Sequence, residues 1–161
     1  MISGLHLLLT YRCTGACDHC FLYCSPESKG VFTLDLLDET LAQARLVPTL
    51  RWIYFEGGEP FLYHPLLLEC LRRTRHHGYH VGVVTNAYWA TGDREAELWL
   101  RPLRDLGVED LSVSEDLFHG SVGPDSPPAR AGGGPPAPAA VGCHLHRSPG
   151  GGGIGCEPRQ G

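Results

Sequence analysis

The stretch Cys13–Cys20, which reads CTGACDHC, follows directly after the apolar run 5–10. Three thiols in the spacing CxxxCxxC suit either zinc or an iron-sulfur cluster, and a fourth ligand completes either kind of site. A site with three cysteines leaves one metal position open, where a substrate or a cofactor can bind. The stretch therefore predicts a metal-binding or cluster-binding loop at the end of a buried strand.

Downstream of this loop, strand patterns and helix patterns alternate. Thr33 is a candidate N-cap, and the helix after it carries leucines at helical spacing and ends before Pro48. The patterns predict strands over 5–10, 51–55, 80–85 and 111–114, and helices over 34–47, 65–77 and 93–106, the last kinked at Pro102. Helical connections between strands imply βαβ units, so we expect an α/β fold with a parallel sheet.

Polar motifs follow each of the four predicted strands. The cysteine loop follows the first, Gly57-Gly58-Glu59-Pro60 the second, Thr85-Asn86 the third and Ser114-Glu115-Asp116 the fourth. In parallel sheets the chemistry gathers at the carboxyl ends of the strands. We therefore expect these motifs to meet at one edge of the sheet.

Composition limits the classes of function. With 161 residues, 42% of them hydrophobic, the chain has the size of one ordinary domain. A net charge of -5 and a pI near 5.9 argue against a general nucleic-acid or membrane-surface binder and favour small-molecule or protein partners. No signal peptide and no membrane-spanning run is predicted. Seven cysteines, four of them between positions 13 and 24, suggest metal ligation in a reducing cytoplasm.

After Gly120 the composition changes abruptly to Gly and Pro with little apolar periodicity. Such a segment cannot offset its ordering entropy by burial, so we expect a core over 1–120 and a disordered tail over 121–161. The abrupt onset is also typical of out-of-frame translation. On this reading the sheet has only four strands, and the fourth is an unpaired edge.

Together, Cys13xxxCys17xxCys20, the Gly57–Pro60 turn and Thr85-Asn86 resemble the radical S-adenosylmethionine (radical SAM) superfamily over about residues 5–119. The resemblance implies a partial (β/α) barrel that holds a 4Fe-4S cluster, of which only the first four βα units are present. It also implies that SAM chelates the fourth iron and is cleaved reductively to a 5′-deoxyadenosyl radical, which abstracts hydrogen from a substrate. The chain is then a truncated or frameshifted member.

The resemblance assigns the metal ligands to Cys13, Cys17 and Cys20. His19 stands where the family usually has an aromatic residue near adenine. Gly15 and the short spacers are expected to let the loop wrap closely enough for three thiolates to face one cluster. Cys24 is either a small buried thiol or the fourth ligand of a structural zinc site.

Other residues are expected to bind SAM. Gly57 and Gly58 lack a Cβ and permit close approach of the backbone, while Glu59 and exposed carbonyls accept hydrogen bonds from the SAM ammonium. Pro60 stiffens the turn, and Glu56 beside it is either a supporting carboxylate or merely solvated. The remaining candidates, at the third and fourth strand ends, are Thr85, Asn86, Ser114 and Asp116; the last two lie where the family contacts ribose or the methionine carboxylate.

Two functions from different classes remain open at this point. One is a radical SAM enzyme whose substrate is an unknown small molecule or peptide and whose electron donor is a flavodoxin or a ferredoxin. The other is a non-catalytic module in which zinc or an iron-sulfur cluster serves structure or an interaction. Nothing in the sequence identifies the substrate.

Overall fold

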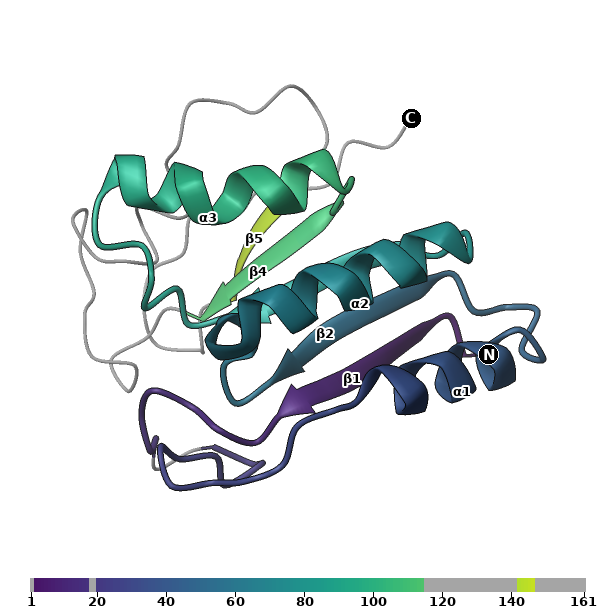
Figure 1. The fold of residues 1–161 in the computed structure, drawn as a ribbon, viewed down its shortest axis with the longest axis horizontal. Helices are drawn as coiled ribbons and strands as arrows, with labels where there is room; N and C mark the ends of the chain where they lie inside the picture. The colour runs from purple at the N-terminus through teal and green to yellow at the C-terminus, as the bar shows by residue number, and fades with distance from the viewer. Residues whose placement is uncertain (1, 18–19, 115–141, 147–161) are drawn as a thin grey trace.

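The computed structural model describes residues 2–17 and 20–114 in full and the backbone of 142–146. Parallel strands alternate with helices along the chain, as Figure 1 shows. The elements are β1 (Gly4–Thr10), α1 (Leu34–Ala44), β2 (Trp52–Gly57), the short 3-10 helix η1 (Pro60–Tyr63), α2 (His64–His76), β3 (His80–Thr85), α3 (Asp93–Asp105), β4 (Asp110–Ser114) and β5 (Gly142–His146).

The sheet has the order β1-β2-β3-β4-β5, and every neighbouring pair of strands is parallel. In Figure 1, α1, α2 and α3 lie on the same face of the sheet, with α2 in contact with both other helices. Sequential parallel strands with helices on one face wind in the manner of a (β/α) barrel, whereas a doubly wound sheet carries helices on both faces. The predicted α/β fold with a partial barrel is confirmed.

The core lies between the sheet and these helices. Alternate residues of each strand point into it, such as Ile53 and Phe55 of β2, which are fully buried. Leu37 and Leu41 of α1 pack against them on the helix side. Most strand residues between the buried ones are half-buried or exposed, so much of the other face of the sheet remains accessible; Gly82 of β3 is an exception and is buried under the Tyr54 ring.

The helices begin and end close to the predicted positions. Thr33 caps α1, because its Oγ1 accepts a hydrogen bond of 3.2 Å from the Leu36 N–H. The break expected at Pro102 is absent, since α3 runs unbroken from Asp93 to Asp105. Pro102 lies in the last turn, where Leu103 packs into the core and holds the helix in place. No helix in the described ranges has the length and apolar character needed to cross a bilayer.

The strand β5 is the main difference from the sequence analysis. It pairs in parallel with β4, from Asp110 opposite Gly142 to Ser114 opposite His146. The fourth strand is therefore not an unpaired edge, and the stretch expected to be disordered contains a strand. The segment lies within Gly- and Pro-rich sequence, which masks it as a strand, and its pairing partner β4 supplies the ladder. The rest of 121–161 lies outside the described residues.

Candidate functional site

A cavity of about 220 Å³ lies at the carboxyl ends of the strands, beside the cysteine loop. It is the place where the polar motifs meet. Its lining comes from the loop and from the ends of β2, β3 and β4: Cys13, Gly15, Cys17, Cys20, Phe21, Leu22, Cys24, Glu56, Gly57, Gly58, Val84, Thr85, Asn86 and Ser114. Of the residues predicted for the site, Glu59 and Pro60 do not line the cavity, and His19 and Asp116 lie outside the described residues.

The three predicted ligand cysteines are all partly exposed and all line the cavity. Cys24 lines it too but is buried, and its N–H lies 3.4 Å from Cys20 Sγ. Burial, followed by the charge of Cys20, raises the pKa of the Cys24 thiol to about 11. Cys24 thus differs from the three predicted ligands in its burial, which makes its thiolate harder to form.

Within the described ranges, no three Cys, His, Asp or Glu side chains are arranged to hold a single metal ion. An iron-sulfur cluster makes a different demand, because its cysteines ligate separate irons and need not converge on one point. Three thiols spread around one cavity suit such a cluster.

The Gly57-Gly58 turn packs directly on the backbone that leads into the cysteine loop. The N–H of Gly58 donates to the Thr10 carbonyl at 2.7 Å, and the N–H of Glu59 donates to the Arg12 carbonyl at 2.8 Å. A Cβ on Gly58 would lie 2.1 Å from the Arg12 oxygen, and one on Gly57, whose φ is 132°, would lie 2.3 Å from the Thr10 oxygen. The glycines were expected to admit a ligand, but the group that approaches them is the protein's own backbone.

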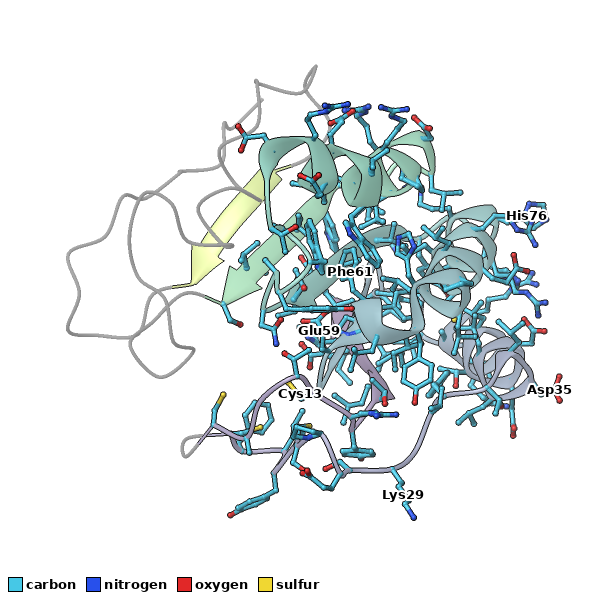
Figure 2. The ribbon with its side chains drawn as sticks, turned by 60° about the vertical axis from the view of Figure 1, so that its left-hand side comes forward. Cys13, Lys29, Asp35, Glu59, Phe61 and His76 are labelled. Carbon is cyan, nitrogen blue, oxygen red and sulfur yellow. The ribbon has the colours of Figure 1, made fainter. Side chains whose placement is uncertain are left out.

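Glu59 is fully buried, and its carboxylate is occupied within the protein. It accepts hydrogen bonds from the Phe61 N–H at 3.0 Å, the Thr85 hydroxyl at 2.9 Å and the Asn86 N–H at 2.8 Å. Figure 2 shows Glu59 between Cys13 on the loop and Phe61 in the core. In the structure this side chain joins β2 to the end of β3 and does not line the cavity, and its expected contact with the SAM ammonium stays a prediction.

The end of β3 carries this connection to the cysteine loop. Asn86 Nδ2 lies 3.6 Å from Cys13 Sγ and donates to the Thr14 hydroxyl at 2.9 Å. Beside it, the Thr85 hydroxyl accepts hydrogen bonds from the Ala87 N–H at 3.0 Å and from Trp89 Nε1 at 3.1 Å. Hydrogen bonds of this kind hold ligand side chains in place and adjust the properties of a bound cluster.

Sequence reasoning left Glu56 undecided and did not name His6. The structure places Glu56 in the cavity wall, with Oε2 at 2.9 Å from His6 Nδ1. The alternation of β2 could have indicated that Glu56 faces away from the core. Glu56 stands two residues after Tyr54, on the face opposite the buried Phe55. Pairing with a histidine 50 residues earlier depends on the register of β1 and β2, which no local pattern shows.

We expect Glu59 to make the protein less stable as the pH rises from 5 to 7. Burial raises the pKa of its carboxyl from an ordinary 4.5 to about 7, although three hydrogen bonds partly oppose the shift. Between these values the folded chain keeps a proton that the unfolded chain has released, so the free energy of unfolding decreases by about 3 kcal/mol in total. Urea denaturation of the native protein and of Glu59→Gln across this range measures the difference, and parallel pH profiles would contradict it.

Comparisons with known proteins agree with this geometry. The sequence model of the Radical SAM superfamily matches residues 7–118. The chain is 32% identical over 115 residues to the tungsten-containing aldehyde ferredoxin oxidoreductase cofactor-modifying protein of Pyrococcus furiosus, covering 71% of this chain and 31% of that protein. It is 33% identical over 132 residues to the GTP 3',8-cyclase of Synechococcus sp. (strain WH7803), covering 73% and 35%.

A solved structure, that of BtrN in complex with AdoMet and 2-DOIA, resembles this fold with a TM-score of 0.59 at 17% identity. The match covers 91% of this chain and 57% of BtrN. At this level of identity the likeness concerns the fold. The chain spans about a third of the length of the two relatives above, whose shares are 31% and 35%.

Proposed function

The chain belongs to the radical SAM superfamily, whose members are enzymes, and on that premise we propose that it cleaves SAM reductively with a 4Fe-4S cluster. Cys13, Cys17 and Cys20 are the proposed ligands. The observation that carries the proposal is the single cavity in which these thiols meet the Gly57-Gly58 turn and Asn86. A set of three thiols leaves one iron open for the amino and carboxylate groups of SAM.

The residues present fit a bound cluster. The three ligand thiols are accessible from one cavity, whereas Cys24 is buried, which makes its thiolate harder to form. The amide of Asn86 lies against Cys13 Sγ, where it can stabilise a thiolate by donating a hydrogen bond. The turn that would face SAM is fixed to the loop by two backbone hydrogen bonds, so the two halves of the site keep their relative position.

When bound and reduced, the cluster supplies the electron that cleaves the sulfonium of SAM into methionine and a 5′-deoxyadenosyl radical. The chain's own residues bind and orient. Exposed backbone carbonyls of the Gly57-Gly58 turn are proposed to accept from the SAM ammonium, and Ser114 to contact the ribose or the methionine carboxylate. Phe21, Leu22 and Val84 give the cavity apolar lining, although Phe21 itself is 81% exposed.

The partners are proposed from family membership. A one-electron donor such as a flavodoxin or a ferredoxin reduces the cluster, and the substrate is a small molecule or a peptide. Because ligation requires reduced thiols, a cytoplasmic location is part of the proposal. Substrate chemistry belongs to the whole protein, and this chain spans about a third of its relatives' length.

Anaerobic reconstitution with iron and sulfide, followed by SAM and a reductant, tests the proposal. We expect 5′-deoxyadenosine and methionine to form in equal amounts, and only when cluster, SAM and reductant are all present. Metal analysis of the same samples separates an iron-sulfur cluster from zinc. Zinc without iron and sulfide, or a cluster that leaves SAM intact, would favour the non-catalytic module instead.

A further inference from the structure

The face of the sheet that the helices leave uncovered carries aromatic and ionisable side chains beside aliphatic ones, and it meets the cavity at Glu56, Val84 and Ser114. On the helix side, β2 presents the fully buried Ile53 and Phe55, whereas on this side it presents Trp52, Tyr54 and Glu56, all partly accessible. Parallel sheets are ordinarily covered on both faces by apolar layers. A face with accessible aromatic and ionisable groups is the wall of a binding site rather than half of a second core.

Glu56 stands where this face enters the cavity. Apart from the thiols, it is the one ionisable side chain among the described residues that line the cavity. Its Oε2 is held at 2.9 Å from His6 Nδ1, and its side chain keeps 21% of its surface exposed. His6 pairs with Tyr54 in the register of β1 and β2, toward the amino ends of the strands. The Glu56–His6 pair therefore lies on the side of the cavity away from the cysteine loop.

Tyr54 continues the wall below Glu56. Its ring stacks on His6 with centroids 4.8 Å apart, and it crosses β3 at Gly82, where a Cβ would lie 2.3 Å from the tyrosine ring. Gly82 is paired with Asp110 of β4, so the Tyr54 ring extends toward that carboxylate. Burial, together with the Asp110 carboxylate, raises the pKa of the Tyr54 hydroxyl to about 12. Asp110 Oδ1 is buried without a hydrogen-bond partner in the described part of the chain. A second carboxylate thus lies beside the same ring.

The strands of this wall supply carboxylates and no lysine or arginine. Strands β1 to β4 contain Glu56 and Asp110 as their acidic residues. At the far end Glu109 forms ion pairs with His80 and with Arg75, so its charge is offset within the protein and it adds no free carboxylate. Carboxylates next to aromatic rings bind ammonium and guanidinium groups, through charge-assisted hydrogen bonds and cation–π contacts.

We propose that Glu56, oriented by His6, binds a cationic nitrogen of the substrate, either a primary ammonium or a guanidinium. This inference rests on the proposed function, since it places the substrate beside the SAM site. It adds the substrate's chemical class: an amine or a guanidine, free or as a lysine or arginine side chain of a peptide.

Matched probes test the proposal on the full chain. Nα-acetyl-lysine amide and Nα-acetyl-norleucine amide differ in the side-chain ammonium, and ligand-observed NMR measures their affinities. We expect the lysine probe to bind and the norleucine probe to bind at least about tenfold more weakly, as loss of one charge-assisted hydrogen bond implies. Glu56→Gln should weaken lysine binding by a similar factor. Glu39→Gln, the same change of charge on an exposed residue of α1, should leave it unchanged.

The titrations are made on the chain without a cluster and repeated on the reconstituted chain with SAM. If no cluster forms, the proposed function fails while the first titration still reports on Glu56. Equal affinity for both probes, or equal losses in the Glu56 and Glu39 variants, would overturn the proposal. So would a Glu56→Gln variant whose affinity for SAM falls as much as its affinity for the lysine probe, because Glu56 would then serve SAM.

Discussion

Replacing Cys13, Cys17 or Cys20 by alanine is expected to abolish the visible absorption of a reconstituted 4Fe-4S cluster. All three thiols line one cavity and are accessible from it. The fourth iron already lacks a protein ligand, so each single replacement leaves a second iron without one. Absorption spectra with iron and sulfide analysis of the three variants measure the effect, which should be a loss of most of the bound cluster.

Cys24→Ala is the matched control, because it removes a thiol from the same loop. Its side chain is buried, and burial raises the pKa of its thiol to about 11, so its thiolate is harder to form. The variant should retain the cluster. If it lost the cluster while one of the other three variants kept it, the ligand set would have to be reassigned.

Gly58→Ala is expected to destabilise the protein by about 2 to 4 kcal/mol and to impair cluster assembly. The added Cβ would lie 2.1 Å from the Arg12 oxygen and 2.9 Å from the Tyr11 carbonyl carbon, and backbone atoms of this kind cannot rotate away. The turn and the loop must therefore separate. The separation lengthens the hydrogen bonds that the Gly58 N–H donates to the Thr10 carbonyl and the Glu59 N–H donates to the Arg12 carbonyl. Urea denaturation of the cluster-free chain measures the loss.

Gly15→Ala provides the comparison within the cysteine loop. A Cβ on Gly15 meets no atom of the described residues within 4 Å, so the cluster-free variant should unfold at nearly the same denaturant concentration as the native chain. The role expected of Gly15 in wrapping the loop around a cluster stays a prediction. If both substitutions destabilised the chain similarly, the cause would be a general intolerance of added side chains in this region. The close contact between Gly58 and the Arg12 carbonyl would then not explain the effect of Gly58→Ala.

The fold followed from patterns that are local in sequence. Each strand and helix carries its own pattern of buried residues, such as the alternation in β2 and the leucine spacing in α1. We could therefore predict, within a residue or two, the strands over 80–85 and 110–114 and the start of the helix at Leu34. Pro102 and β5 were missed for a different reason. Each depends on a tertiary partner, the packing of Leu103 in one case and the edge of β4 in the other.

Part of the cavity lining could be predicted from the sequence, but the contacts of its residues could not. Residue type and strand position place Cys13, Gly58 and Asn86 at one edge, and the structure brings them together. The side chain of Glu59 was assigned to a ligand, yet it is satisfied by Thr85 and Asn86, which lie 26 and 27 residues away. Which donors a buried carboxylate meets depends on how β2 and β3 are arranged in space, and a motif read along the chain does not contain that information.

Electron paramagnetic resonance of the reduced, reconstituted chain with and without SAM tests the central claim most directly. The claim is that three cysteines hold a 4Fe-4S cluster whose fourth iron SAM occupies. We predict a signal of a reduced 4Fe-4S cluster whose g values change when SAM is added. Adenosine, which lacks the methionine part of SAM, is the control and should leave the g values unchanged. A cluster signal indifferent to SAM, or a chain that takes up zinc and no iron or sulfide, would contradict the account.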